Sequence, residues 1–485
     1  MLWLAILLPD LPLQVFTRGL RDVPAIAITA DKPGAPLIAA SASAQAAGIR
    51  PGQHATSASA LLPELRLHAR MPRREAEALN EIASWAGRFT PRVSLSSPDA
   101  VLLEIASCLR LFGSAHDITT QVASGLAALG FHARIGLAPT PLAARWFARC
   151  GRPAGEDWLQ AIDQLPLSVL EDEAACDADT RALLAGLGLH SLGEARDLPA
   201  AGLARRGAQA VRHCLARARG EMPDPRPWFE AADTFSHGLE LPAPTHHSEA
   251  LLFAARRLLA SLEGWLQARH AAIDHCQLIL EHAHRPHSRL ELVLGQPCRD
   301  TAGLLAILRE QLARLVLEAD VGALRLIADR PLAAIARTGV LFDDVGTLRE
   351  QAVLLLDRLR ARLGQSSVHL LASQPDHRPE SAWRQGDASC AGSPAQHTCS
   401  AHATPLAREH KGLHVRPLWL LPEPKPIERA DYVLLSEAER IECGWWDDHP
   451  VHRDYYLANN TGQALCWIFQ ALDPPGRWFL HGYFA

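Results

Sequence analysis

The sequence lacks any apolar run long enough to cross a membrane and any sign of an export signal. A spanning helix needs about 18 consecutive apolar residues, and no segment of the 485 residues reaches that length. The apolar start, MLWLAILLPDLP, has no basic residues before it and ends in a Pro-Asp turn, so we expect a first core strand there. These absences predict a cytoplasmic protein with no membrane partner.

Paired cysteine motifs and an excess of one charge are also missing. The ten cysteines include no CxxC pair, which favours reduced thiols over a disulfide framework. The formal net charge is only -5, so any contact with nucleic acid must come from local basic patches. With 48% hydrophobic and 21% charged residues, the chain suits about three or four globular domains.

One buried strand with a carboxylate at each end organises the N-terminal half. In SLSSPDAVLLEI, residues 94–105, the apolar block reads as a strand covered on both faces, with Asp99 leading in and Glu104 inside. An acidic pair at such a strand is a candidate metal site for phosphoryl transfer. Here the residue after Asp99 is Ala100, so the pair is broken.

This segment resembles the palm motif of Y-family translesion DNA polymerases, S-L-D-E-A-Y-L-D-V. The catalytic Asp-Glu of that family falls on Asp99 and Ala100. The family's first-strand motif, D-M-D-x-F-F, aligns with residues 8–13. Its first Asp aligns with Leu8, and the aromatic residue that would select the sugar of an incoming nucleotide aligns with Leu13. Only Asp10 keeps a carboxylate there, and a simple turn residue beside two prolines is the alternative.

The resemblance extends to the segments that would hold a nucleotide. Residues 37–67 resemble the fingers, but the Tyr and Arg that would bind a triphosphate fall on Ala42 and Gln45. In ARIGLAPTPLAARWFARCGRP, the family's two lysines fall on Pro141 and Arg145. A triphosphate needs fixed cationic or hydroxyl donors, and only Arg145 could still hold a phosphate. A helix-surface arginine is the alternative interpretation of Arg145.

These losses predict a polymerase scaffold without its chemistry. The resemblance implies no catalytic residues, with Asp10, Asp99 and Glu104 as remnants, and no cofactor. An active polymerase would instead need magnesium bound by these three carboxylates in a rearranged site.

Residues 161–225 read as a helical thumb. LLAGLGLHSLGEARDLP resembles a helix-hairpin-helix turn, in which backbone amides near Gly186, Gly188 and Gly193 can bind a DNA phosphate. Basic residues follow, with Arg205 and Arg206 as the leading DNA contacts. An ordinary glycine-broken helical hairpin is the alternative.

Residues 235–333 alternate between strand and helical periodicity in the order βαββαβ, a split βαβ sheet. This order fits the little finger of the Y family, which lies along DNA. Arg256 and Arg257 are candidate phosphate contacts, although exposed arginines on any sheet domain would look the same.

The C-terminal third carries candidate links to partners. Residues 334–384 are predicted to be a linker that contains a clamp-binding motif and a helix. In it, Thr338, Leu341 and Phe342 resemble the Q-x-x-L-F clamp-binding peptide, and an edge strand is the alternative interpretation.

Residues 385–415 are rich in Ser, Ala, Gly and His, a composition that predicts an exposed segment. Its cysteines and histidines match no zinc spacing, so we predict no metal.

Residues 416–485 are aromatic and read as a small β-rich subdomain with turns at 459–462 and 473–476. The pairing of this tail with a disabled palm resembles a non-catalytic branch of the Y family found in a bacterial mutagenesis complex. A plain packed β-subdomain is the alternative.

The predicted fold is therefore α/β (α+β), a Y-family-like right hand with palm and fingers over residues 1–160. The resemblance implies a scaffold for error-prone translesion synthesis in the SOS response. Its partners would be primer-template DNA, the sliding clamp, an error-prone C-family polymerase and a RecA-like accessory protein. The alternatives are an active translesion polymerase and a protein-binding hub that does not touch DNA.

Overall fold

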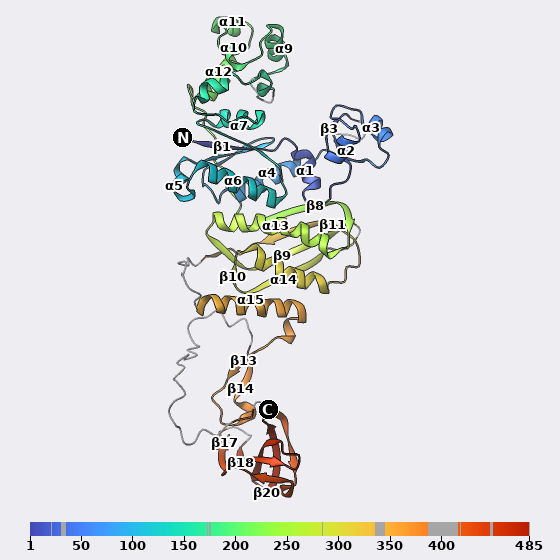
Figure 1. Ribbon diagram of the computed structural model, residues 1–485, viewed down its shortest axis with the longest axis vertical. Coiled ribbons are helices and arrows are strands. Elements are labelled where there is room, and N and C mark those ends of the chain that lie inside the picture. The colour runs from blue at the N-terminus through green and yellow to red at the C-terminus, as the bar shows by residue number, and fades with distance from the viewer. Residues whose placement is uncertain are drawn as a thin grey trace. The chain divides into compact units, whose positions relative to one another are not determined.

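The computed structural model consists of two compact units, residues 1–363 and 364–485 (Figure 1). It describes the chain except for residues 21, 31–34, 172, 174–175, 284, 335–344, 387–415, 418, 447–449 and 485. The division falls inside the predicted 334–384 linker. Among the described residues, no helix has the length and apolar character required to span a membrane.

The palm of the first unit is an antiparallel sheet in the order β5-β6-β1-β7. Its strands are β1 (Trp3–Leu7), β5 (Val93–Ser96), β6 (Ala100–Glu104) and β7 (Arg134–Ala138). In β6, Val101 and Leu103 pack toward α4 (Pro72–Ala86) and α6 (Ala115–Leu129), whereas Ala100 and Leu102 pack toward α7 (Pro141–Cys150) and the thumb. Strand β6 is thus buried on both faces, as predicted.

The fingers form a small three-stranded sheet in the order β3-β2-β4. Short helices pack on it because alanines at their inner positions allow close approach to the sheet. Helix α1 (Leu11–Thr17) precedes the fingers in the chain. The fingers consist of β2 (Ile26–Thr29), β3 (Leu37–Ala40), α2 (Ala42–Ala46), α3 (Ala55–Leu61) and β4 (Arg66–Ala69).

The thumb is entirely helical, and its apolar positions join the α7 side of the palm core. This agrees with the small-residue helical periodicity of the sequence. Its helices are α8 (Trp158–Asp163), α9 (Ala178–Gly186), α10 (Leu192–Arg196), α11 (Ala200–Arg205) and α12 (Gln209–Ala218).

The little finger has the predicted βαββαβ order, folded as a sheet in the order β10-β9-β11-β8. Its elements are β8 (Phe235–Thr245), α13 (Ser248–Ala268), β9 (Ala271–His282), β10 (Ser288–Cys298), α14 (Thr301–Arg314) and β11 (Val321–Ala328). A further helix, α15 (Val345–Leu363), packs along β10, where the amide of Gly295 donates to the Asp357 carboxylate at 2.9 Å.

The second unit contains the predicted β-rich subdomain, and most aromatic side chains of residues 416–485 pack in its core. The sheet runs β15-β20-β19-β18-β16, and β17 pairs with β18. The strands of this sheet are β15 (Trp419–Ile427), β16 (Tyr432–Leu434), β17 (Glu439–Cys443), β18 (Val451–Asn460), β19 (Leu465–Leu472) and β20 (Pro475–Tyr483). A separate hairpin of β13 (Leu370–Ser373) and β14 (Trp383–Gly386) precedes them in the chain.

A buried polar network ties the hairpin segment to this subdomain. A 2.8 Å hydrogen bond joins His481 to the Tyr455 hydroxyl, which also accepts from Arg453 at 3.0 Å. Arg453 is ion-paired at 3.0 Å with Glu380, which lies in the short 3-10 turn between β13 and β14. Burial lowers the pKa of His481 to about 4, so this ring is neutral at neutral pH.

Candidate functional sites in the palm and thumb

The positions that would hold metal ligands at the end of the palm sheet are apolar and buried. Leu8 is fully buried, and its amide donates to the carbonyl of Asp99 at 2.8 Å. Ala100 is also fully buried and pairs with Leu7 across the sheet. Neither side chain can bind a cation, so Asp99 is the only one of these three positions with a charged side chain.

The Asp99 carboxylate is bound by two guanidinium groups from α7. Nη2 of Arg145 lies 3.1 Å from Oδ1 of Asp99, and Nη2 of Arg149 lies 3.4 Å from Oδ2. Arg145 also reaches Glu173, at the start of the thumb, at 3.3 Å. The indole of Trp146 donates to the same Glu173 oxygen at 3.2 Å. The place of a metal ion beside Asp99 is thus taken by permanently charged side chains.

Neither interpretation of Arg145 from the sequence fits this arrangement. Its side chain is 7% exposed, so it is not a helix-surface arginine. Its guanidinium already binds two carboxylates, which leaves it poorly suited to hold a phosphate. Arg149 and Glu173 were missed from the sequence. The i, i+4 spacing of the two arginines, which places them on one face of α7, was the available signal.

The three remnant carboxylates do not converge. Asp99 and Glu104 lie at opposite ends of β6, roughly 17 Å apart at the usual rise of an extended strand. Glu104 accepts from the amide of Ala106 at 3.2 Å and pairs with Arg92 at 3.4 Å. Asp10 is exposed at the start of α1. No cluster of three metal-binding side chains occurs in the part of the chain that the structure describes, so these residues do not fit a magnesium site.

The positions expected to contact a triphosphate offer little to an anion. The Gln45 amide donates to the carbonyl of Ala40 at 2.8 Å, and Ala42 has no polar side chain. Pro141 is buried as the first residue of α7. A cavity of about 190 Å³ does lie beside Asp99, with Arg70 in its wall. Arg70 is paired bidentately with the buried Glu75 at 2.8 and 2.9 Å, a pair that sequence analysis missed.

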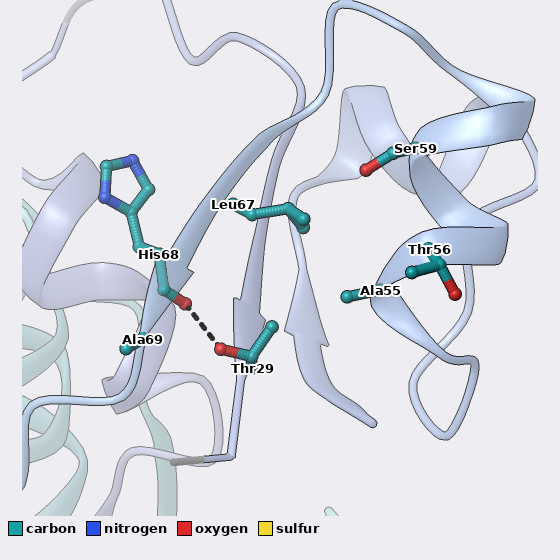
Figure 2. Close-up of a pocket in the computed structure, with 7 residues that line it drawn as sticks. All are labelled: Thr29, Ala55, Thr56, Ser59, Leu67, His68 and Ala69. Carbon is teal, nitrogen blue, oxygen red and sulfur yellow. Dashed lines mark hydrogen bonds between the residues drawn. The ribbon is translucent and has the colours of Figure 1, made fainter. Parts of the chain in front are cut away.

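A larger hollow of about 560 Å³ lies in the fingers (Figure 2). Its polar groups are mainly hydroxyls, and the Thr29 hydroxyl donates to the carbonyl of His68 at 3.3 Å. The His68 ring points away from Thr56 and Ser59 and stacks on Phe16 at 4.8 Å. Among the described residues, the lining contains no lysine, arginine or acidic side chain, so those residues offer no group that would hold a triphosphate or a metal.

The thumb glycines have different roles. Gly186 ends α9, and Gly188 has a φ of +71° in the following turn, a backbone conformation that favours glycine. Gly193 instead lies inside α10, where a Cβ would be only 3.1 Å from the Cβ of Asp163. The small size of Gly193 thus serves packing against α8, and its role as a phosphate contact stays a prediction.

Arg205 and Arg206 lie at the turn between α11 and α12, and both are exposed. No described residue forms an ion pair with either of them. Arg196 and Arg219, by contrast, are both paired with Asp163. The exposed turn thus presents cations that are available to an external anion.

The little finger arginines also separate into two kinds. Arg256 is exposed on α13. Arg257 instead lies against the palm, where it donates to the carbonyl of Ala127 at 3.3 Å, and burial lowers its pKa. The structure therefore contradicts the prediction of Arg257 as a DNA contact. The predicted clamp residues Thr338, Leu341 and Phe342 lie outside the described residues.

The chain is similar to several known proteins. Residues 13–149 match the impB/mucB/samB family. Protein ImuB of Caulobacter vibrioides is 28% identical over 478 residues, 90% of this chain and 100% of that protein. DNA polymerase IV 2 of Mesorhizobium japonicum is 28% identical over 202 residues, 39% of this chain and 44% of that protein. The crystal structure of DinB from Sulfolobus solfataricus overlaps 69% of this chain and 100% of its own, at 14% identity and a TM-score of 0.36.

The chain is therefore similar to Y-family polymerase-like proteins, and the impB/mucB/samB match covers residues 13–149. The similarity to Protein ImuB extends over nearly the whole length of the chain and confirms the resemblance inferred from the palm motif and the aromatic tail.

Replacing Arg145 tests the charge network of the palm. Arg145→Met leaves Asp99 and Glu173 without their shared partner in a largely buried site, and we expect unfolding to become easier by about 3 kcal/mol. The double variant Asp99→Asn, Arg145→Met should lose less than the sum of the two single changes. Urea unfolding of the full chain measures both effects.

Arg110→Met is the matched control, because Arg110 is exposed and without an ion pair in the described chain. It should change stability by less than about 0.5 kcal/mol. An Arg145→Met variant as stable as this control would contradict the structural role of Arg145.

Proposed function

We propose that the chain is a non-catalytic scaffold for error-prone translesion DNA synthesis in the cytoplasm during the SOS response. One observation carries this proposal. Asp99, the carboxylate aligned with a catalytic aspartate, is bound by Arg145 and Arg149 instead of standing open to a cation. The similarity to Protein ImuB, whose length the chain matches entirely, supports placing it among mutagenesis proteins.

Polymerase chemistry makes the loss of carboxylates decisive. Nucleotidyl transfer uses divalent metals to activate the attacking hydroxyl and to stabilise the charge that builds on the phosphates. A guanidinium can neutralise Asp99, but it cannot coordinate the attacking oxygen. With Leu8 and Ala100 in the other ligand positions, the palm is expected to need no metal and no nucleotide.

The rival proposal is an active polymerase that uses Asp10, Asp99 and Glu104. One metal ion would have to contact carboxylates that lie at the two ends of β6. Such a site would require the palm sheet to rearrange, and the buried ladder between β1 and β6 opposes that change.

Primer extension separates the two proposals. We expect no nucleotide incorporation by the purified chain with magnesium or manganese, on a template with or without a lesion. Asp99→Ala should therefore leave the result unchanged. Incorporation that disappears on Asp99→Ala would instead establish the rival.

The scaffold needs a surface that holds DNA without reading its sequence. The exposed thumb turn supplies Arg205 and Arg206, which have no ion-pair partner in the described part of the chain, and the turn near Gly188 supplies exposed backbone. Such groups bind the phosphate backbone, and their binding weakens as salt rises because bound counterions are released. A protein-binding hub that does not touch DNA would lack this property.

Arg205→Ala, Arg206→Ala should weaken binding to a fluorescent primer-template by about tenfold. The slope of log affinity against log salt should become less steep by about 2, since two phosphate contacts are lost. Arg299→Ala, Arg309→Ala is the matched control, because both are exposed arginines without an ion pair in the described chain. Equal losses in the two variants, or no salt-dependent binding at all, would favour the hub.

The partners of this scaffold follow from the resemblance to the mutagenesis branch of the family. We expect it to bind the sliding clamp, an error-prone C-family polymerase and a RecA-like accessory protein. Leu341 and Phe342 supply the two apolar anchors of a clamp peptide.

A pull-down from purified components tests this set. The intact chain should retain both the clamp and a C-family polymerase, whereas Leu341→Ala, Phe342→Ala should lose the clamp alone. Retention of the clamp by the double variant would place the clamp site elsewhere. Failure of the intact chain to bind either protein would contradict the proposed partners.

A further inference from the structure

The little finger is packed directly on the helical layer of the palm. Helix α13 lies against α4 and α6, and Trp85 is buried at their junction. A Cβ at Gly125 of α6 or at Gly264 of α13 would lie only 2.1 Å from the Trp85 ring. Glycine at both positions allows the three helices to close around one indole, as in a domain core.

A buried arginine, Arg18, links the same two parts. Arg18 and Glu81 of the palm lie 2.7 Å apart, with side chains only 5% and 2% exposed. The other end of the Arg18 guanidinium donates to the carbonyl of Gly238, in edge strand β8 of the little finger, at 3.0 Å. Separating the little finger would leave a buried arginine without one of its acceptors, which is unfavourable.

The connection from thumb to little finger is also fastened to its surroundings. Trp228 stacks on Trp3 of the palm at 6.0 Å, and the amide of Phe229 donates to the carbonyl of Val93 at 2.7 Å. Nearer its other end, the connection contains Ala232, whose carbonyl accepts from Trp265 of α13 at 3.2 Å and from Arg269, the residue after α13, at 2.7 Å. This segment is therefore held at both ends instead of forming a free linker.

We propose that the palm and the little finger of this chain form one rigid body that stays closed when DNA binds. Domains joined by small polar contacts usually move relative to one another, whereas a large apolar interface with buried charge holds them together. Arg257, docked on the palm, is part of this interface. The proposal concerns the arrangement of the chain and does not depend on whether the palm is catalytic.

A reversible crosslink across the interface tests it. A Cβ at Gly87, at the end of α4, would lie 3.2 Å from the Cβ of Ala268, at the end of α13, which is close to disulfide geometry. In the full chain, Gly87→Cys, Ala268→Cys should form an intramolecular disulfide in high yield without DNA. Peptide mapping by mass spectrometry identifies this bond among those of the native cysteines.

Two controls sharpen the test. Gly87→Cys, Arg256→Cys places the second thiol on the same helix roughly 18 Å further along, and this pair should not crosslink. The oxidised Gly87→Cys, Ala268→Cys protein should bind the fluorescent primer-template within about twofold of its reduced form. Equal crosslinking of the two pairs, or no crosslink at position 268, would overturn the proposal.

The DNA comparison gives a second way for the proposal to fail. A loss of affinity of tenfold or more on oxidation, restored by reductant, would show that the little finger must leave the palm to bind DNA. If neither form binds DNA, the scaffold function is contradicted, while the crosslinking yield still tests the docked arrangement.

Discussion

The ion pairs between Asp99 and the two arginines of α7 are the constraint on which the rest of the palm depends. The Asp99 carboxylate is partly buried, so it needs partners that neutralise it, and here those partners come from within the chain. Because Arg145 also binds Glu173, the same guanidinium connects the palm to the start of the thumb. A position that an enzyme keeps open for an ion thus serves to hold two parts of this chain together.

Much of the fold was predictable from the sequence because its signals are local. The alternation of apolar residues in β9, β10 and β11 depends only on neighbouring positions, and so does the helical spacing in α14. The lost ligands at Leu8 and Ala100 could be recognised because side-chain type alone decides whether a residue can bind a metal. The partners of Asp99 could not be predicted, since Arg145 and Arg149 are distant from it in sequence and meet it only in the folded chain.

The arginines show most clearly that local sequence cannot predict contacts made in the folded chain. Arg206 and Arg257 both occur in helical segments with basic neighbours, and nothing local in the sequence separates them. In the structure, one is exposed at a turn and the other lies against the palm. The difference arises from the packing of α13 on α6, which brings together residues that are far apart in the chain. Charge composition therefore predicted a capacity to bind phosphate but could not decide which arginines are available for it.

The two proposals, a palm without polymerase chemistry and a closed interface with the little finger, are physically related. A polymerase must shift its hold on the duplex after each nucleotide it adds, so a little finger packed irreversibly on the palm would hinder it. A scaffold that occupies one position on the template has no such requirement. In that setting, the buried Trp85 and the Arg18–Glu81 pair stabilise the chain without limiting its function. With Leu8 and Ala100 at two of the ligand positions, the proposed scaffold has no need for that movement, and the interface can hold the palm and the little finger together.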